Sequence, residues 1–185
     1  MSSARLFVAL EPPAAARTAL ARWGSRACDA DPALRAVGEE ALHLTVHFLG
    51  ERPQADVEAL RAAVAQAPAT CIPLAGAGAL WLAPRRPHVL TAALDDVTGA
   101  LEALHRALGA GLESATPGWS RDARPLRPHI TVARVRRGAH PRLEAVPGPP
   151  ELSFAATAVV LLQSRLSPAG AVYEPLARRS LHRGS

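Results

Sequence analysis

The sequence carries the pattern His-x-Thr-Val twice, beginning at His43 and again at His129. Polar and apolar residues alternate through both copies, which is typical of a strand whose successive side chains point to opposite faces. Each histidine therefore shares a face with the threonine two residues later, Thr45 in the first copy and Thr131 in the second. Each copy offers one imidazole and one hydroxyl side by side.

The other face of each strand is apolar, and we expect it to lie in the core. It consists of Leu44, Val46 and Phe48 in the first copy and Ile130 and Val132 in the second. The histidine and threonine faces are then left to form a cleft.

Two such strands facing each other would bring together two proton-transfer groups and two hydroxyl donors. This set suits an in-line displacement at phosphorus, in which one imidazole takes a proton from the attacking group and the other protonates the leaving oxygen. Threonine hydroxyls and backbone N–H groups can hold the non-bridging oxygens.

The composition sets wider limits on the function. The chain of 185 residues has a net charge of +5, and all 21 of its basic side chains are arginines. A basic surface of this kind would fit a polyanion such as RNA. Biased coding composition would also produce a chain rich in arginine, alanine and proline. No apolar run approaches the ~20 residues of a membrane span, and the N-terminal segment is too short for a signal peptide. We therefore expect a cytoplasmic protein.

Neither the cysteines nor the remaining histidines indicate a metal site. Cys28 and Cys71 fit buried small residues better than a disulfide framework or a metal site. A site made of His43, His47 and His129 is conceivable, but no suitably placed carboxylate or cysteine supports it. We expect His47 at the rim of the cleft. The histidines expected at the surface are His88, His105, His140 and His182.

The elements that would position the two patterns follow from hydrophobic spacing and turn residues. We expect strands over residues 5–10, 33–37, 42–49, 71–81, 88–94, 129–135, 151–163 and 172–177. We expect helices over residues 14–27, 53–66 and 97–108, with a short helix near Leu143. Gly109 and Gly111 should end the third helix, Asp95 or Asp96 should cap it, and residues 167–170 read as a hairpin turn.

The order strand, helix, histidine strand occurs twice, over residues 5–49 and 88–135. The two halves share little sequence outside the His-x-Thr pattern, so the repeat is one of pattern. A pseudo-twofold axis relating them would set the two histidine–threonine pairs opposite one another.

With these flanks the chain resembles the two-histidine (2H) phosphoesterase superfamily and, within it, the RNA 2',3'-cyclic phosphodiesterase family, also called the 2'-5' RNA ligase family. The segments that carry the resemblance are residues 5–9, 43–50, 86–90, 127–134 and 164–173. The resemblance implies an α+β, bilobal fold with pseudo-twofold symmetry, in which two antiparallel sheets line a central cleft and helices lie outside. We expect residues 1–185 to form a single domain of two intertwined lobes and the protein to be a monomer.

The resemblance also implies an activity and roles for particular residues. The activity is hydrolysis of the 2',3'-cyclic phosphate at an RNA end to a 2'-phosphomonoester, with no metal and no cofactor. His43 would be the proton donor to the leaving 3' oxygen, and His129 the proton acceptor from water. Thr45, Thr131 and Arg134 would bind the phosphate.

Four residues are less directly implicated. Arg134 falls on the opposite face from His129 by strand alternation, so a twist or a strand end is needed to bring it to the phosphate. Phe48 could contact a nucleotide by stacking, whereas Tyr173 is expected to pack in the hairpin. Thr91 stands where relatives often carry tryptophan, which bears on base preference and not on the chemistry.

Other functions fit the same residues. The same acid–base pair could run 2'-5' RNA ligation or act on another cyclic phosphate of a small nucleotide. A non-catalytic module that binds RNA ends could use the same cleft, and a metal-dependent hydrolase would be recognised by loss of activity in chelator.

Overall fold

The computed structural model describes residues 3–83, 85–167 and 170–182. The α-helices in these residues are α1 (Ala14–Ala30), α2 (Val57–Ala65) and α3 (Ala100–Ala115). The strands are β1 (Ser3–Glu11), β2 (Leu34–Ala36), β3 (Leu44–Pro53), β4 (Pro73–Leu82), β5 (Val89–Asp96), β6 (His129–Val135), β7 (Ser153–Ala155), β8 (Ala158–Ser167) and β9 (Gly170–Ser180). Short 3₁₀ turns cover Glu39–Ala41, Gln54–Asp56 and Leu143–Ala145.

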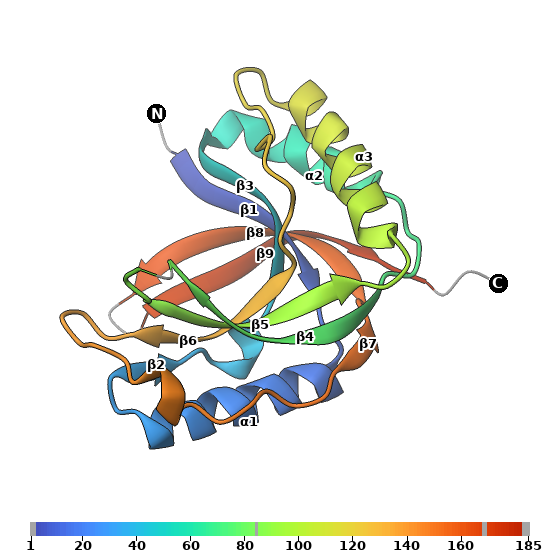
Figure 1. Cartoon of the computed structure of the whole chain (residues 1–185). Helices are drawn as coiled ribbons and strands as arrows, with labels where there is room; N and C mark the ends of the chain where they lie inside the picture. The colour runs from blue at the N-terminus through green and yellow to red at the C-terminus, as the bar shows by residue number, and fades with distance from the viewer. Residues whose placement is uncertain (1–2, 84, 168–169, 183–185) are drawn as a thin grey trace.

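The strands form one curled antiparallel sheet, as Figure 1 shows. Its order is β7-β4-β5-β6-β3-β1-β8-β9, with β2 paired to β6. The two histidine strands, β6 and β3, occupy the centre, and each is flanked by the first strand of its own half. The α+β bilobal fold expected from the sequence is confirmed, with its two sets of strands joined edge to edge at β3 and β6.

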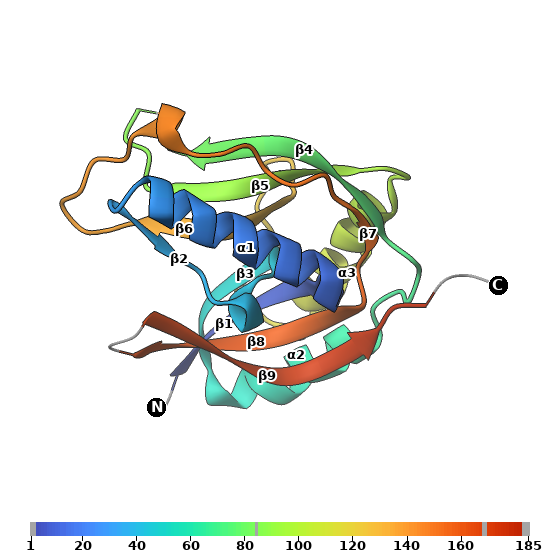
Figure 2. The same cartoon turned by 90° about the horizontal axis from the view of Figure 1, so that it is seen from below.

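The helices cross between the two halves. α1 follows β1 but packs against β2 and β6, and α3 follows β5 but packs against β3, β5 and α2. Figure 2 shows α1 lying between the β4–β5 strands and the β8–β9 strands. Its buried face includes Leu20, Trp23 and Ala27, as the spacing predicted. Each histidine strand is thus supported by the helix of the other half.

Two predicted boundaries were wrong. α3 continues through Gly109 and Gly111 because Leu112 beyond them is fully buried, and this burial outweighs the ~1 kcal/mol that each glycine costs a helix. The strand predicted over residues 151–163 is divided into β7 and β8 because β7 pairs with β4 and β8 pairs with β1, in different halves of the sheet.

Smaller differences concern the ends of elements. The helix predicted over residues 97–108 begins only at Ala100, so Val97 lies outside it and is 60% exposed. The N-cap residue is Gly99 and not Asp95 or Asp96, although the carboxylate of Asp96 accepts a hydrogen bond from the backbone N–H of Glu102 in the first turn. The hairpin turn predicted at residues 167–170 includes residues 168–169, which lie outside the described residues.

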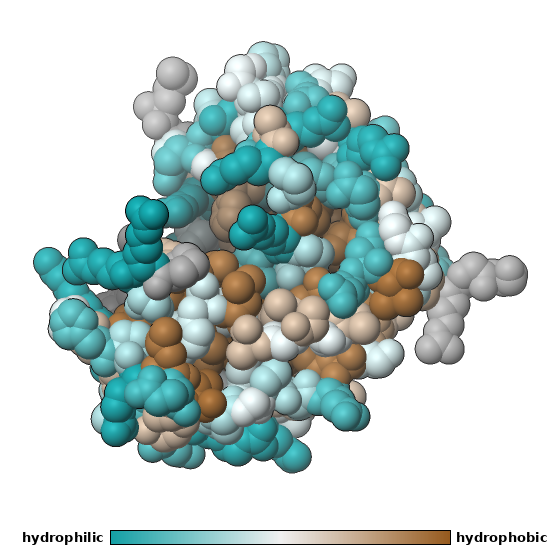
Figure 3. Space-filling model, in the orientation of Figure 1, coloured by the Kyte–Doolittle hydropathy of each residue, from teal (hydrophilic) through white to brown (hydrophobic). Residues whose placement is uncertain are grey.

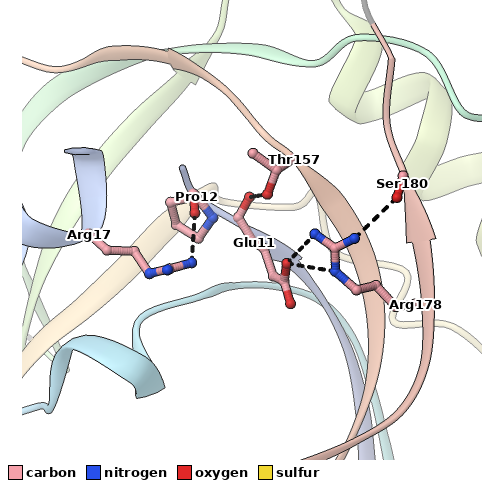
Figure 4. A network of polar contacts seen from close by, with 6 residues as sticks. All are labelled: Glu11, Pro12, Arg17, Thr157, Arg178 and Ser180. Atoms are coloured by element: carbon pink, nitrogen blue, oxygen red, sulfur yellow. Dashed lines mark hydrogen bonds and ion pairs between the residues drawn. The ribbon is translucent and has the colours of Figure 1, made fainter. Parts of the chain in front are cut away.

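A polar network connects the end of β1 to β9 and to Thr157, the residue before β8 (Figure 4). The Glu11 carboxylate accepts hydrogen bonds of 3.1 and 2.9 Å from the guanidinium of Arg178 on β9. The Thr157 hydroxyl donates to the Glu11 carbonyl oxygen.

Among the described residues, no helix is both long and apolar enough to cross a membrane.

Candidate active site

The two His-x-Thr patterns lie on adjacent strands. β3 and β6 meet at the antiparallel backbone pair of Leu44 with Ile130, and both of these side chains are buried. The predicted alternation is therefore observed at the start of both strands. The sequence suggested strands facing across a cleft, whereas the structure places them side by side in one curved sheet.

Antiparallel pairing at this point brings the two patterns together in reverse order. His43 lies beside Thr131, and Thr45 lies beside His129. All four side chains are half-buried, on the face of the sheet opposite the core. One imidazole and one hydroxyl from each half thus meet around the pseudo-twofold axis.

The two histidines are oriented in the same way. Nδ1–H of His43 donates to the carbonyl oxygen of Ala41, and Nδ1–H of His129 donates to that of Arg127, each over 2.7 Å. A carbonyl oxygen only accepts, so this bond fixes the tautomer in which Nδ1 carries the proton. Nε2 of each ring is left to exchange a proton with a substrate.

The surroundings of His43 disfavour its charged form. Burial of the ring lowers the pKa of His43 below its ordinary value, and the positive charges of Arg134 and His129 lower it further. The hydrogen bond to Ala41 acts in the opposite direction. A low pKa makes the imidazolium of His43 a stronger acid.

Two aromatic rings hold the His43 imidazole in place. The ring centroid of Phe7 lies 4.9 Å from that of His43, and the ring of Tyr173 meets His43 edge-on at 5.0 Å. Phe7 and Tyr173 also contact each other, at 5.2 Å. Tyr173 therefore belongs to the site, and the prediction that it only packs in the hairpin was incomplete.

A β-bulge in β3 changes the side on which its later residues lie. Val46 is an extra residue between Thr45 and His47, which pair with consecutive residues of β1. A bulge reverses the alternation beyond it. His47 is therefore buried, and Phe48 is 72% exposed, on the same side as Phe7. The expectations of a core Phe48 and a rim His47 were wrong for this reason, and Phe48 is accessible to a nucleotide.

β6 contains a bulge at the equivalent position. Val132 is an extra residue between Thr131 and Ala133, which pair with consecutive residues of β5. Ala133 is consequently buried, and Arg134 is exposed on the side of Thr131. Strand alternation alone had placed Arg134 on the wrong face. The bulge supplies the change of direction that a phosphate contact requires.

A cavity of about 120 Å³ lies next to His43. Its polar lining consists of Arg35, His43, Thr131, Arg134 and Tyr173. Thr45 and His129 are beside this lining and are not part of it. Nucleotide-sized pockets are usually several times larger, so the cavity suits a phosphate-sized group whose ribose and base lie outside.

Arg35 is a site residue that the sequence reasoning missed. It lies directly opposite Arg134 in the pairing of β2 with β6. No acidic residue lines the cavity that the two arginines share. Arg35 sits in a three-residue strand with no motif around it, whereas Tyr173 at least belonged to a segment that carried the family resemblance.

His47 belongs to a separate cluster on the core side of β3. Its Nε2–H donates to the carbonyl oxygen of His105 over 2.9 Å, and the two imidazoles stack with centroids 4.3 Å apart. Trp119 meets His47 edge-on. Burial lowers the pKa of both histidines. His105 was expected at the surface but is half-buried in this stack.

The position of His47 bears on metal binding. It lies on the other face of β3 from His43, so the three-histidine site considered from the sequence does not assemble. Throughout the described part of the chain, no group of three or more histidine, cysteine or acidic side chains is placed to hold a metal ion.

Comparison with known proteins gives a consistent result. A family model described as the 2'-5' RNA ligase superfamily matches residues 10–167. The RNA 2',3'-cyclic phosphodiesterase of Escherichia coli (strain K12) is 33% identical over 183 residues, covering 96% of each chain. A protein of the same name from Geobacillus stearothermophilus is 30% identical over 173 residues. That match covers 90% of this chain, which spans only 54% of the relative's length.

Solved structures agree with the sequence matches. TT0787 of Thermus thermophilus superposes with a TM-score of 0.81 at 30% identity, over 98% of this chain and 100% of that one. Escherichia coli LigT complexed with 3'-AMP gives a TM-score of 0.75 at 26% identity, again over 98% and 100%.

Proposed function

This chain belongs to the 2'-5' RNA ligase superfamily of two-histidine phosphoesterases, and on this premise we propose that it hydrolyses the 2',3'-cyclic phosphate at the end of an RNA. The product is a 2'-phosphomonoester with a free 3' hydroxyl. The observation that carries the proposal is the reciprocal arrangement of His43 with Thr131 and of His129 with Thr45. It places two imidazoles with free Nε2 atoms on adjacent strands, with His43 lining the phosphate-sized cavity and His129 beside it.

The reaction is a single in-line displacement. Nε2 of His129 takes a proton from the attacking water, whose oxygen forms a bond to phosphorus. The bond from phosphorus to the 3' oxygen breaks, and Nε2–H of His43 gives that oxygen its proton. His129 then returns its proton to solvent and His43 regains one, which restores the starting state.

The remaining groups of the site stabilise charge. The hydroxyls of Thr45 and Thr131 donate to the non-bridging oxygens, and the guanidinium of Arg134 offsets the negative charge that builds up on them. Phe48 provides an exposed aromatic face on which the terminal base can stack. In this mechanism the catalytic groups are side chains of the protein, and no cofactor takes part. The cytoplasmic location and the monomeric state remain predictions.

The test is turnover of a short RNA with a 2',3'-cyclic phosphate end in excess chelator. We expect a 2'-phosphate product, and a loss of ~10²–10⁴ in rate for His43→Ala and for His129→Ala. His182→Ala, which changes an exposed histidine elsewhere, is the matched control and should be fully active.

Several outcomes would contradict the proposal. Near-full activity of either histidine variant would show that the two histidines are not an acid–base pair. A 3'-phosphate product would show that the 2' oxygen, and not the 3' oxygen, is the leaving group. Activity lost in chelator would indicate a metal-dependent hydrolase. RNA binding without turnover would indicate a binding module, and joining of a 5'-hydroxyl RNA in place of hydrolysis would indicate a ligase.

A further inference from the structure

A second and larger cavity, of about 770 Å³, opens at one end of β5 and β6. We call it the basic pocket. Its charged and titratable lining consists of Arg85, Arg86, His88, Arg136, Arg137 and His140. No acidic residue lines it. Figure 3 shows hydrophilic side chains projecting from the left edge of the molecule, where the β4–β5 turn and the loop after β6 lie.

The loop that forms one wall of the basic pocket is anchored to the end of α1. The buried carboxylate of Asp31 accepts a hydrogen bond of 2.6 Å from the backbone N–H of Arg142. The guanidinium of Arg142 donates to the Ala30 carbonyl oxygen, and Trp23 Nε1–H donates to that of Pro147. The wall is therefore fixed in advance of any ligand, which lowers the entropic cost of binding.

The arginines of the pocket divide into two kinds. Arg136 supports the loop, since its Nε–H lies within 3.1 Å of the carbonyl oxygens of Pro32 and Leu34. Arg85, Arg86 and Arg137 are exposed, and none has a carboxylate partner among the described residues. Several exposed arginines elsewhere are paired, such as those at residues 124, 165 and 178. A cluster of unpaired guanidiniums is a surface for a polyanion.

The basic pocket lies close along the chain to the phosphate cavity. Arg134 lines the phosphate cavity and Arg137 lines the basic pocket, so roughly 10 Å of chain separates them at about 3.3 Å per residue. On the other side of β6, Val89 pairs with Arg134, and the preceding residue, His88, lines the basic pocket. The basic pocket is therefore within reach of a nucleic acid whose end is held at Arg134.

We propose that the basic pocket binds the phosphodiester backbone of the RNA on the 5' side of the cyclic end. This inference rests on the proposed function and deepens it, because it makes an RNA chain, and not a mononucleotide, the preferred substrate. Arg85, Arg86 and Arg137 contact successive phosphates, so the recognition is independent of base sequence.

The test compares two substrates in the full-length protein. One is a 2',3'-cyclic mononucleotide, which ends before the basic pocket, and the other is a ten-nucleotide RNA with the same cyclic end. In the variant Arg85→Ala/Arg86→Ala/Arg137→Ala, we expect unchanged turnover of the mononucleotide and a rise of about tenfold or more in KM for the RNA. The slope of log(kcat/KM) against log[salt] for the RNA should become shallower by about 2, because each phosphate that the protein no longer neutralises accounts for ~0.7 of the slope.

The control is Arg61→Ala, which removes one exposed arginine from α2, outside the basic pocket. It should leave the kinetics of both substrates unchanged. An unchanged KM and salt slope for the RNA in the triple variant would overturn the inference while leaving the proposed function intact. Equal losses on both substrates would also overturn it, because the arginines would then act on the site itself.

Direct binding separates this inference from the proposed function. Fluorescence anisotropy of a labelled ten-nucleotide RNA ending in a 2'-phosphate measures binding without turnover. If the wild type turns over neither substrate, weaker RNA binding by the triple variant alone still supports the basic pocket. Equal binding by both proteins would refute it.

Discussion

Arg35 lies directly opposite Arg134 on the neighbouring antiparallel strands β2 and β6, and both line the cavity beside His43. An anion in this cavity can bind to both guanidiniums, since each planar guanidinium can donate two hydrogen bonds to a pair of phosphate oxygens. We therefore interpret Arg35 as the second cation of the phosphate site.

The first prediction concerns this pair. Inorganic phosphate should raise the melting temperature of the wild type, because a ligand bound only to the folded state stabilises it. In Arg35→Ala we expect about tenfold weaker phosphate binding, which removes about 1.4 kcal/mol of that stabilisation at saturating phosphate. Arg61→Ala should respond like the wild type. If phosphate raised the melting temperature of Arg35→Ala as much as that of the wild type, Arg35 would not be part of the phosphate site.

The second prediction assigns the acid and the base by pH dependence. Arg134 lowers the pKa of His43, so Arg134→Gln should raise that pKa. A general acid must be protonated, and its activity is lost as pH rises through its pKa. If His43 is the proton donor, the alkaline limb of the kcat/KM profile therefore moves to higher pH in Arg134→Gln. Movement of the acidic limb instead would make His43 the base.

Much of this site could be read from the sequence. Strand alternation and the recurrence of His-x-Thr predicted His43, Thr45, His129 and Thr131 as site residues, and the structure brings these four side chains together. The apolar residues within the two patterns are buried as expected. These are local patterns with period two, and they hold up to the first irregularity. The repeat also implied a twofold relation that brings the two patterns together, but it predicted strands facing across a cleft and not the direct pairing of β3 with β6.

The rest depended on features that local patterns do not encode. A bulge reverses every side chain beyond it, so one extra residue at Val46 and another at Val132 changed the environments of His47, Phe48 and Arg134. Arg35 reaches the site only because β2 pairs with β6, and Tyr173 only because β8, its hairpin partner, pairs with β1. No window of sequence around either residue carries that information.

The third prediction tests the outward position of Phe48. Phe48→Ala should weaken binding of a nucleotide substrate by about 1–3 kcal/mol if the ring stacks on a base. The unfolding free energy should change by less than about 0.5 kcal/mol, since the ring is exposed. Val97→Ala, another exposed apolar side chain, is the control for both measurements. A large loss of stability with unchanged KM would make Phe48 a packing residue after all.

The fourth prediction concerns the buried histidine on the other side of β3. Burial lowers the pKa of His47 in the folded state below the ordinary value of 6.5. The unfolded chain then binds more protons, so stability is complete above pH 6.5 and falls as pH drops through the lowered pKa. His47→Gln keeps a donor for the His105 carbonyl oxygen and should show a smaller fall between pH 7.5 and 5.5 in denaturant titrations. His88→Gln, at an exposed position, should retain the full dependence, and an equal fall in all three proteins would contradict the assignment.

The last prediction concerns the contact that supports the bulge of β6. Gly24 of α1 lies so close to this strand that a Cβ there would be 2.8 Å from the carbonyl oxygen of Val132. That oxygen already accepts a hydrogen bond from the backbone N–H of Val37. Moving the strand or the helix to make room would therefore weaken this hydrogen bond or the packing of α1. Gly24→Ala should therefore destabilise the protein by about 1–3 kcal/mol.

Gly111 of α3 provides the control, because a Cβ there would meet open space. Gly111→Ala should stabilise the protein by about 0.5–1 kcal/mol through helix propensity alone. Denaturant unfolding of both variants measures the difference, and a Gly24→Ala protein as stable as Gly111→Ala would show that close packing of α1 on the bulge is not needed to hold β6 in place.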